Sequence, residues 1–326
     1  MRTVLITGGA GFIGSHLADR LVAHGDRVVV VDDLSTGRRA NVAQLMSHPR
    51  FRLIVASAAD REPMDRLVRA CDTVVHLAAA VGVQLIRKRR LSSLLANLGC
   101  GPVLFEAAAR HGRPVLLASS SEVYGYAAPI PVSEDAPRVV GTAADLRASY
   151  ATAKALEETM ADAYAHELGL QVVTVRLFNT VGPRQRAEQG MVLPSFVRRA
   201  LRGSPLQIYG DGLQTRCFAH VLDVVDALEA LLECPPARGL VLNVGSQDEV
   251  TVLDLARRAV EAAGVRVPIE LVGYPEGFLE PRRRVPDTTR IRSLVGWAPR
   301  RSLDETIRDV VSEHRAMGSA AVASAG

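Results

Sequence analysis

The stretch from residue 2 to residue 33 constrains the fold more than any other part of the chain. It opens with a short apolar run, residues 4–6, typical of a strand that is buried on both faces. Three glycines follow at spacings of three: Gly8, Gly11 and Gly14. An apolar-periodic helix is then predicted to end near Gly25, and a second apolar strand, residues 28–31, ends at two aspartates. This order of strand, glycine turn, helix, strand and acid predicts a dinucleotide-binding unit.

The physical roles of these positions predict NAD as the cofactor. Glycines allow the backbone to approach a pyrophosphate, and the helix N-terminus offers unpaired N–H groups and a partial positive charge. The carboxylate of Asp32 is expected to accept a hydrogen bond from a ribose hydroxyl. Because no arginine directly follows Asp32 and a carboxylate repels a 2′-phosphate, the pattern favours NAD over NADP. A glycine-rich turn in some other α/β domain is the alternative.

The rest of the chain predicts an α/β fold. Strands and helices alternate as far as residue 177, which indicates right-handed crossovers and a Rossmann-type doubly wound parallel sheet. After residue 179 the loops lengthen and prolines appear, so a smaller, discontinuous C-terminal substrate-binding lobe is expected. The predicted division assigns residues 1–178 and 219–246 to the NAD-binding domain, 179–218 and 247–316 to the lobe, and 317–326 to a frayed tail.

Composition excludes several classes of protein. With 48% hydrophobic and 23% charged residues over 326 positions, the chain has the composition of a globular protein with a sizeable core. The first strand begins at once, leaving no room for a signal peptide, and no apolar run reaches membrane-spanning length, so no membrane partner is expected. Four scattered cysteines lack metal-ligand spacing; they predict no metal site and a cytoplasmic location.

The charge pattern does not predict nucleic-acid binding. The net charge is only +4, and the arginine-rich segments 87–90 and 282–284 carry no interleaved aromatic side chains. A solvated face or a small anionic ligand explains these segments better. Lysine occurs only at Lys88 and Lys154.

Tyr150 and Lys154 are the strongest catalytic candidates. They lie four residues apart on a helix predicted over residues 150–168, and therefore share a face. A tyrosine is a poor base at neutral pH because its ordinary pKa is about 10. A neighbouring ammonium and a bound oxidised nicotinamide both favour the phenolate, and serines 119–121 end the preceding strand. A Tyr–Lys pair at this spacing also arises by chance on helix surfaces.

Together with the glycine turn, Asp32 and Ser120, the Tyr150-x-x-x-Lys154 pair resembles the extended short-chain dehydrogenase/reductases, specifically the NAD-dependent nucleotide-sugar epimerase/dehydratase/decarboxylase family. The likeness covers nearly the whole chain. Further motifs that carry it are Val31-Asp32-Asp33-Leu34-Ser35-Thr36-Gly37, His76-Leu77-Ala78-Ala79, Arg176-Leu177-Phe178-Asn179, Gly182-Pro183-Arg184 and Gly296-Trp297. The resemblance implies NAD as cofactor and a UDP-sugar as substrate.

The resemblance also implies a role for each matching residue. Tyr150 would take the proton of the sugar 4-hydroxyl while C4 gives hydride to NAD, Lys154 would bind the nicotinamide ribose, and Ser120 would hydrogen-bond the 4-oxygen. The implied cofactor-binding residues are Gly8, Gly11, Phe12, Ile13, Gly14, Asp32, Asp33, Ser35, Thr36, Gly37, Asp60, Leu77, Ala78, Ala79, Tyr150 and Lys154. The implied substrate-binding residues are Ser120, Ser121, Asn179, Arg186, Val192, Leu193, Tyr209, Arg216 and Arg282, the last two as diphosphate clamps. For Val192, Leu193 and Tyr209, a place in the core is an equal alternative.

Two features suggest a sugar that carries a carboxylate. Arg186 stands where UDP-glucuronate 4-epimerases place a carboxylate-binding arginine, whereas Ser121, Glu122 and Arg284 resemble the UDP-glucuronate decarboxylases. The main expectation is 4-epimerisation of UDP-glucuronate to UDP-galacturonate through a 4-keto intermediate, with Arg186 restraining the carboxylate. The alternative is a decarboxylase that makes UDP-xylose or its 4-keto precursor, with Glu122 and Arg284 as active groups. A UDP-glucose 4-epimerase is the second alternative.

A non-catalytic NAD-binding regulator is an alternative of a different class, and the Tyr150–Lys154 pair argues against it. The resemblance further implies a homodimer formed by two helices of each subunit, here those predicted over residues 92–110 and 150–168.

Overall fold

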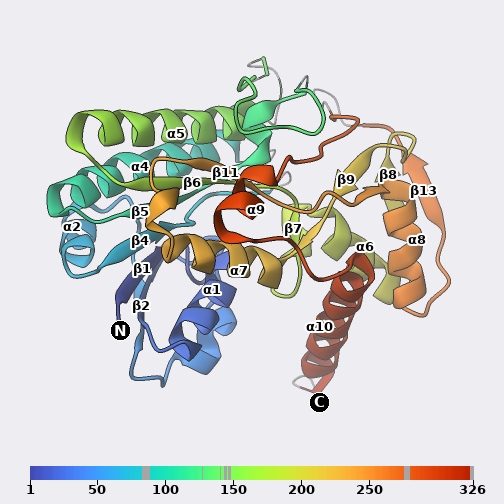
Figure 1. Ribbon diagram of the computed structural model, residues 1–326. Coiled ribbons are helices and arrows are strands. Elements are labelled where there is room, and N and C mark those ends of the chain that lie inside the picture. Colours follow the sequence, from blue (N-terminus) through green and yellow to red (C-terminus); the bar gives the residue numbers. More distant parts are fainter. Residues whose placement is uncertain are drawn as a thin grey trace.

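The computed structural model describes residues 1–82, 89–126, 128–139, 141–142, 145, 148–274 and 280–323. Its centre is a seven-stranded parallel sheet with the order β11-β6-β5-β4-β1-β2-β3 (Figure 1). The strands are β1 (Thr3–Thr7), β2 (Arg27–Asp32), β3 (Phe51–Val55), β4 (Thr73–His76), β5 (Val115–Ser120), β6 (Val172–Leu177) and β11 (Val241–Val244). The order reverses between β1 and β4, which opens a crevice at the carboxyl ends of these strands. This architecture confirms the predicted Rossmann-type fold.

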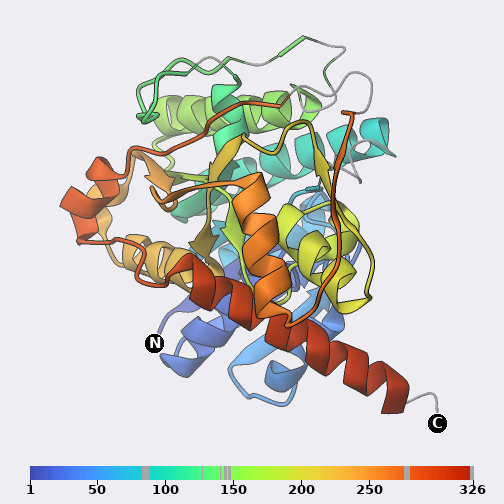
Figure 2. The same ribbon diagram turned by 90° about the vertical axis from the view of Figure 1, so that its right-hand side faces the viewer.

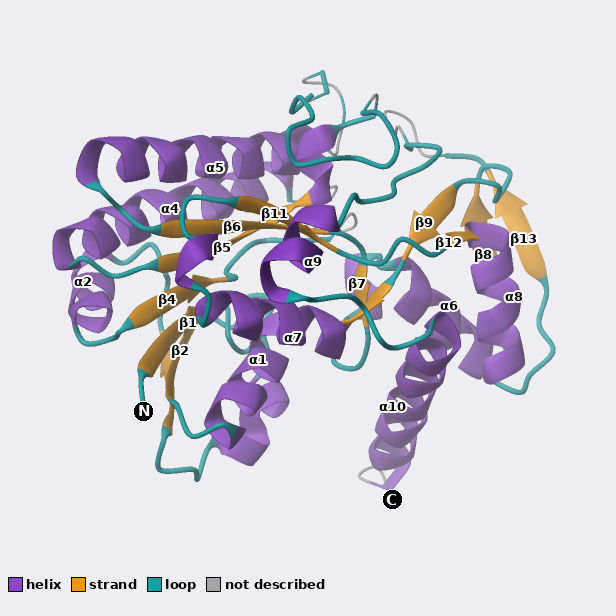
Figure 3. Ribbon diagram, viewed as in Figure 1, coloured by secondary structure: helices purple, strands orange, loops and turns teal. Residues whose placement is uncertain are grey.

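Helices cover both faces of the sheet (Figure 3). On one face lie α1 (Phe12–Ala23), the 3-10 helix η1 (Arg39–Leu45) and α7 (Val221–Leu232), whose apolar side chains share a core with β1 and β2. On the other face lie α2 (Arg61–Arg69), α4 (Arg90–His111) and α5 (Ala148–Leu168). The strands are therefore buried on both sides, as their continuous apolar runs require.

A second lobe with its own core lies beyond the carboxyl ends of the strands. Its elements are α6 (Val192–Leu201), β8 (Leu206–Tyr209), β9 (Thr215–Cys217), β12 (Glu249–Thr251), α8 (Val252–Ala262), β13 (Ile269–Val272) and α10 (Leu303–Ala323). Strand β12 pairs with β9 antiparallel, and β13 pairs with β8 in parallel. Two very short strands, β7 (Thr180–Val181) and β10 (Ala219–His220), pair with each other near the junction with the sheet domain.

Helix α10 begins with a reciprocal cap. The backbone N–H of Glu305 donates to the Ser302 hydroxyl at 3.2 Å, and the Ser302 backbone N–H donates to the Glu305 carboxylate at 2.7 Å. Figure 2 shows the helix passing along the base of the molecule and projecting at its C-terminal end. Because alanine favours helix, α10 continues through Ala323, so the prediction of a frayed tail from residue 317 is wrong as far as that residue.

The segment after the second lobe returns to the sheet domain. Helix α9 (Thr289–Val295) packs on β11, and Ile291 and Trp297 join the core beneath β1 and β2. The predicted division, which places all of residues 247–316 in the lobe, therefore differs from the structure at α9. The reason is that the apolar side chains of this segment complete the face of the sheet that α7 covers.

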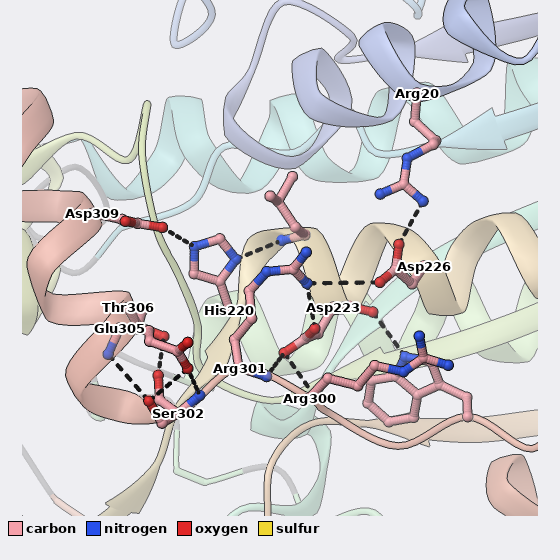
Figure 4. A network of polar contacts seen from close by, with 12 residues as sticks. Arg20, His220, Asp223, Asp226, Arg300, Arg301, Ser302, Glu305, Thr306 and Asp309 are labelled. Atoms are coloured by element: carbon pink, nitrogen blue, oxygen red, sulfur yellow. Dashed lines mark hydrogen bonds and ion pairs between the residues drawn. The ribbon is translucent and has the colours of Figure 1, made fainter.

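A cluster of hydrogen bonds fixes the connection between α9 and α10 (Figure 4). The buried carboxylate of Asp223 on α7 accepts from the backbone N–H groups of Arg300 and Arg301 at 3.2 and 3.0 Å, and from the Arg301 guanidinium at 2.5 Å. The indole N–H of Trp297 donates to the backbone oxygen of Asp223 at 2.8 Å. These contacts tie the sheet domain to the segment that leads into the second lobe.

Helix α4 is long and apolar enough to cross a membrane by length and composition alone. The expectation that no segment reaches this length is wrong in that sense. About 44% of its most apolar window is buried, and the helix packs against α2 and α5. Pro102 lies inside α4 without ending it, because packing on both neighbouring helices outweighs the lost hydrogen bond.

Candidate active site

A cavity of about 540 Å³ lies at the carboxyl ends of the parallel strands, between the sheet domain and the second lobe. Its wall includes the glycine turn after β1, the ends of β2, β4, β5 and β6, the first turns of α5 and residues of α6, β8 and β9. This is where ligands bind in open parallel sheets.

In the glycine turn no side chains cover the backbone at the cavity wall. Gly8 has a φ of +72°, and a Cβ there would lie 2.7 Å from the backbone of Ala78. A Cβ on Gly14 would lie 2.5 Å from the carbonyl oxygen of Gly8, so only glycine allows α1 to pack this closely on the turn. Helix α1 begins at Gly11 with no side-chain cap, which leaves the N–H groups of its first turn to a ligand.

Two carboxylates stand at the end of β2. Asp32 is 7% exposed and accepts from the backbone N–H groups of Ala10 and Leu34, both at 2.9 Å. Burial, with a contribution from neighbouring Asp33, raises the pKa of Asp32. Asp33 accepts from the hydroxyl and backbone N–H of Ser35 at 2.6 and 2.9 Å. Both aspartates line the cavity, and each carboxylate oxygen keeps a further lone pair for a hydroxyl donor.

Tyr150 and Lys154 meet Ser120 on the cavity wall. The pKa of Tyr150 is raised by burial, with Glu122 adding to the rise, while Lys154 and a hydrogen bond with Ser120 lower it. The Lys154 side chain is 4% exposed. A phenol, an ammonium and a hydroxyl are thus gathered where sequence reasoning placed them, and they can exchange a proton with a substrate hydroxyl.

A buried chain of polar groups continues from Lys154 toward β1. The ammonium donates to the backbone oxygen of Ala118 at 2.8 Å and to the Glu157 carboxylate at 2.7 Å. The other oxygen of Glu157 lies 2.9 Å from Nε2 of His76 on β4. Nδ1 of His76 lies 2.6 Å from the hydroxyl of Thr7 on β1. Sequence reasoning assigned no role to Glu157, although its spacing of three from Lys154 puts the two on one helix face.

Glu122 is held beside this group by an arginine from a distant loop. Its carboxylate lies 2.7 Å from the Arg284 guanidinium, which also donates to the backbone oxygen of Gly125 at 3.3 Å. The Arg284 side chain is 5% exposed and that of Glu122 is 19% exposed. The backbone N–H of Glu122 donates to the Ser120 hydroxyl at 3.2 Å, which fixes the turn of η2 (Ser121–Tyr124) next to Tyr150.

A second buried network anchors the turn from behind. The guanidinium of Arg176 forms a two-pronged pair with Glu158 at 2.9 and 2.8 Å and donates to the hydroxyl of Tyr124 at 2.9 Å. The hydroxyl of Ser119 donates to Glu158 at 2.5 Å. Since burial opposes a charge here, the pairing with Glu158 is what keeps Arg176 charged and raises its pKa. This network fixes β5, β6 and α5 relative to one another.

Comparison with known proteins supplies the family. A model described as "NAD dependent epimerase/dehydratase family" matches residues 4–245. The chain is 38% identical over 317 residues to a UDP-N-acetyl-alpha-D-glucosaminuronate decarboxylase of Bacillus cytotoxicus, covering 95% of this chain and 97% of that protein. The chain belongs to the NAD-dependent epimerase/dehydratase family.

Two further members illustrate the range of this family. UDP-glucuronic acid decarboxylase 1 of Arabidopsis thaliana is 34% identical, covering 96% of this chain and 69% of that protein. The crystal structure of a UDP-glucuronic acid 4-epimerase variant from Bacillus cereus, solved with NAD and a fluorinated UDP-glucuronic acid, has a TM-score of 0.88 at 26% identity. It covers 97% of this chain and 99% of that chain.

The residues of this family member fit NAD. The bare glycine turn and uncapped start of α1 suit a pyrophosphate, and the carboxylates of Asp32 and Asp33 suit ribose hydroxyls. The small side chains of Ala78 and Ala79 after β4 leave space in the cavity, so that a flat ring can lie across the strand ends toward Tyr150. Among the described residues there is no group of three or more potential metal ligands.

Most residues assigned by the resemblance lie on the cavity wall, and their individual roles stay predictions. They are Gly8, Gly11, Phe12, Ile13, Gly14, Asp32, Asp33, Ser35, Thr36, Leu77, Ala78, Ala79, Ser120, Ser121, Glu122, Tyr150, Lys154, Asn179, Arg186, Val192, Tyr209 and Arg216.

Four assigned residues lie outside the wall. Gly37 packs against the Asp32 carboxylate. Asp60 is exposed at the start of α2, where it accepts from the Ser57 backbone N–H at 3.3 Å. The Leu193 side chain is fully buried in the core of the second lobe.

Arg282, the fourth, is 68% exposed and forms an ion pair with Asp211 at 2.9 Å; its role at a diphosphate stays a prediction. Arg216 does reach the cavity, where it forms an ion pair with Glu280. Sequence reasoning also missed Gln214 and Tyr274 on the same wall. The pairing of Tyr274 with Tyr209 joins segments far apart in the chain, which periodicity cannot reveal.

Proposed function

We propose that this protein is an NAD-dependent decarboxylase of a UDP-hexuronate. The observation that carries the proposal is the Glu122–Arg284 pair, which lies beside the Tyr150 phenol and the Ser120 hydroxyl. The similarity to decarboxylases at 38% and 34% identity over nearly the whole chain supports it. The order of preference in the sequence analysis, which placed 4-epimerisation first, is therefore reversed.

The reaction begins at the sugar 4-hydroxyl. Tyr150, as phenolate, takes the hydroxyl proton, and Ser120 donates a hydrogen bond to the oxygen as it becomes a carbonyl. Lys154 stabilises the phenolate and, from the cavity wall, would hold the nicotinamide ribose. When bound, NAD supplies the acceptor for the C4 hydride and later returns it. The product of this half-reaction is a 4-keto uronate.

The 4-keto uronate is a β-keto acid. The C5–C6 bond breaks, CO2 leaves, and the electron pair moves into an enolate over C5, C4 and the 4-oxygen. A proton is then added at C5. This step is fastest when the breaking bond is perpendicular to the carbonyl plane, so what matters is how the protein holds the carboxylate.

Glu122 and Arg284 favour loss of the carboxylate. Because Arg284 is engaged by Glu122 at 2.7 Å, its guanidinium is not placed to fix a substrate carboxylate in the carbonyl plane. The negative charge of Glu122 disfavours a second carboxylate nearby, and that repulsion is relieved when CO2 leaves. The proton that C5 needs comes from a water molecule, which the Glu122 carboxylate can orient as a hydrogen-bond acceptor.

The side chains at the far end of the cavity suit a uridine diphosphate group as the ligand. The rings of Tyr209 and Tyr274 stack with centroids 6.1 Å apart and offer a flat surface to a base. The side-chain oxygen of buried Gln214 has no protein partner among the described residues, so it can accept from a base N–H. The Arg216 guanidinium at the same wall suits a phosphate.

A second candidate function is 4-epimerisation of a UDP-hexuronate, which Arg186 favours. It lines the cavity and donates to the backbone oxygen of Thr36 at 3.3 Å, while its Nε is buried and has no hydrogen-bond partner among the described residues. A carboxylate held there in a fixed plane would resist decarboxylation and allow the 4-keto sugar to turn over. The similarity to the Bacillus cereus 4-epimerase supports this candidate.

Product analysis tests the proposal. The purified protein is incubated separately with UDP-glucuronate, UDP-N-acetylglucosaminuronate and UDP-glucose, and products are identified by NMR and mass spectrometry. We expect a uronate to lose one carbon as CO2 and to leave a UDP-pentose or its 4-keto precursor. A uronate that keeps all its carbons and changes configuration at C4 would establish the epimerase instead, and turnover of UDP-glucose alone would exclude both.

Two single variants separate the candidates. Glu122→Gln should lower the rate of CO2 release by about 100-fold or more while leaving UDP-sugar binding intact, because it removes the repelling charge and the carboxylate that orients a water. Arg186→Gln, which removes a charge from the same wall, should leave CO2 release unchanged. If Arg186→Gln stops the reaction and Glu122→Gln does not, the decarboxylase proposal is wrong.

A further inference from the structure

Glu157 occupies a buried position behind the catalytic pair. It lies three residues after Lys154 on α5, and its side chain is 6% exposed. Its two carboxylate oxygens serve two different partners, Lys154 at 2.7 Å and His76 at 2.9 Å. Burying a carboxylate costs free energy unless the charge is paired. The two contacts together therefore stabilise the ionised Glu157 side chain in this position.

Glu157 and the backbone oxygen of Ala118 together orient the Lys154 ammonium. An ammonium has three N–H donors in tetrahedral array, and these two acceptors, at 2.7 and 2.8 Å, engage two of them. With two donors fixed, the direction of the third is set by geometry. Since Lys154 lines the cavity, that donor is available to a ligand or to the phenol.

His76 extends this arrangement to the glycine turn. Its Nδ1 contacts the Thr7 hydroxyl at 2.6 Å, and that hydroxyl accepts from the backbone N–H of Ala78 at 3.4 Å. Both Thr7 and His76 end strands whose next residues line the cavity. The chain of contacts therefore connects Lys154 to the floor of the dinucleotide cleft through side chains that are all buried.

We propose that Glu157 is a positioning residue that keeps the Lys154 ammonium charged and aimed into the cavity, and so sets the pH at which Tyr150 becomes a phenolate. This inference rests on the proposed role of Tyr150 as the base. It does not depend on which sugar is bound or on whether the product is an epimer or a pentose.

The charges that face this group agree with the proposal. Burial opposes the charge on Lys154, but Glu157 outweighs it and raises the pKa of Lys154. Burial alone would raise the pKa of Glu157; Lys154 and His76 instead lower it to about 2.

The neighbouring elements add two groups. Cys100 on α4 faces Glu157 and Lys154 with a pKa that burial raises to about 11, and Glu122 on η2 raises the pKa of Tyr150, as Glu157 itself does. At neutral pH the thiol is uncharged. Among these charged neighbours, Lys154 lowers the pKa of Tyr150 and the two glutamates raise it.

Glu157→Gln tests the proposal because it keeps the size of the side chain and removes its charge. Tyrosinate formation in the NAD-loaded protein is followed by ultraviolet difference spectroscopy against pH, with a Tyr150→Phe protein subtracted to isolate the one phenol. Without the carboxylate, the buried ammonium loses its charge or its direction, and Lys154 affects the pKa of Tyr150 more than Glu157 does directly. We therefore expect the Tyr150 titration to move to higher pH by about half a unit to one unit. In turnover, kcat should fall about tenfold while KM for the UDP-sugar stays unchanged.

Two further variants complete the experiment. Glu157→Asp keeps the charge and should restore the wild-type Tyr150 titration. Glu167→Gln removes a charge from the exposed end of the same helix and should shift nothing. A Glu157→Gln titration that stays in place or moves to lower pH would overturn the proposal. Failure of every uronate to turn over would overturn the proposed function while leaving the titration result to stand.

Discussion

Single buried side chains determine how this protein responds to acid. His16 on α1 is 9% exposed, and its Nε2–H donates to the backbone oxygen of Pro183 at 2.9 Å, joining the sheet domain to the loop after β7. Burial, assisted by Arg184, lowers the pKa of His16 to about 4. The folded protein therefore holds a neutral imidazole over a range in which the unfolded chain is protonated.

The sign of the effect follows from this lowered pKa. The unfolded chain binds a proton at His16 below about pH 6.5, and the folded protein does not until about pH 4, so stability falls as the pH drops through this window. Between pH 7 and pH 5 the wild type should lose on the order of 1–2 kcal/mol more unfolding free energy than His16→Gln, which still donates to Pro183 but never charges. Urea unfolding at the two pH values measures this, and equal losses would contradict it.

At the same scale, sequence could predict residues whose partners are near in the chain. The spacing of Tyr150 and Lys154 follows from helix geometry, and the structure brings both to the cavity. Glu157 stands at an equally informative spacing, but which of several acids on α5 turns inward depends on its packing against β4 and α4. The ion pair of Arg282 with Asp211 could not be predicted, because Asp211 lies 71 residues earlier and no local pattern indicates that pair.

At the scale of elements, long periodic segments were predictable and short paired ones were not. The helices α1, α5 and α7 and the strands of the central sheet follow from apolar periodicity. Strands β7 and β10 are each two residues long, and they form only because they pair with each other although they lie far apart in the sequence. The predicted division placed helix α9 in the wrong domain for a related reason. Its own sequence does not indicate which surface it packs against.

The anchoring of the segment between α9 and α10 can be tested through Asp223. Asp223→Ala leaves two buried backbone N–H groups and the Arg301 guanidinium without their shared acceptor, and should cost about 2–4 kcal/mol of unfolding free energy. Asp226→Ala, one turn along α7, removes an acid that is 30% exposed and pairs with Arg20, and should cost less than about 1 kcal/mol. Chemical denaturation of both variants measures the difference, and similar losses would show that burial of Asp223 is not what matters.

At the scale of the whole molecule, helices α4 and α5 lie side by side on one face of the sheet (Figure 1). Leu91 and Leu95 on α4 are 69% and 59% exposed, and Leu156 on α5 is 44% exposed. Apolar side chains on neighbouring helices are typical of a surface that a second subunit covers, and the homodimer that the family resemblance implies stays a prediction.

The dimer is tested by a charge on that surface. The double variant Leu91→Glu/Leu156→Glu should run as a monomer in light scattering coupled to size exclusion, whereas the wild type should run as a dimer. Leu271→Glu, at a comparably exposed leucine on β13 of the second lobe, should remain a dimer. A monomeric wild type would refute the expectation, as would a double variant that still pairs.

The return of α9 to the sheet domain limits how this enzyme can be re-engineered. The polypeptide leaves that domain after β6, comes back for α7 and β11, leaves again and returns once more with Trp297. The second lobe is therefore not a contiguous segment of the chain. A chimaera built with a single crossover would split a core between two parents. Recombination breakpoints must instead be placed at each passage between the halves, and new substrate preferences are better sought in the individual loops that border the cleft.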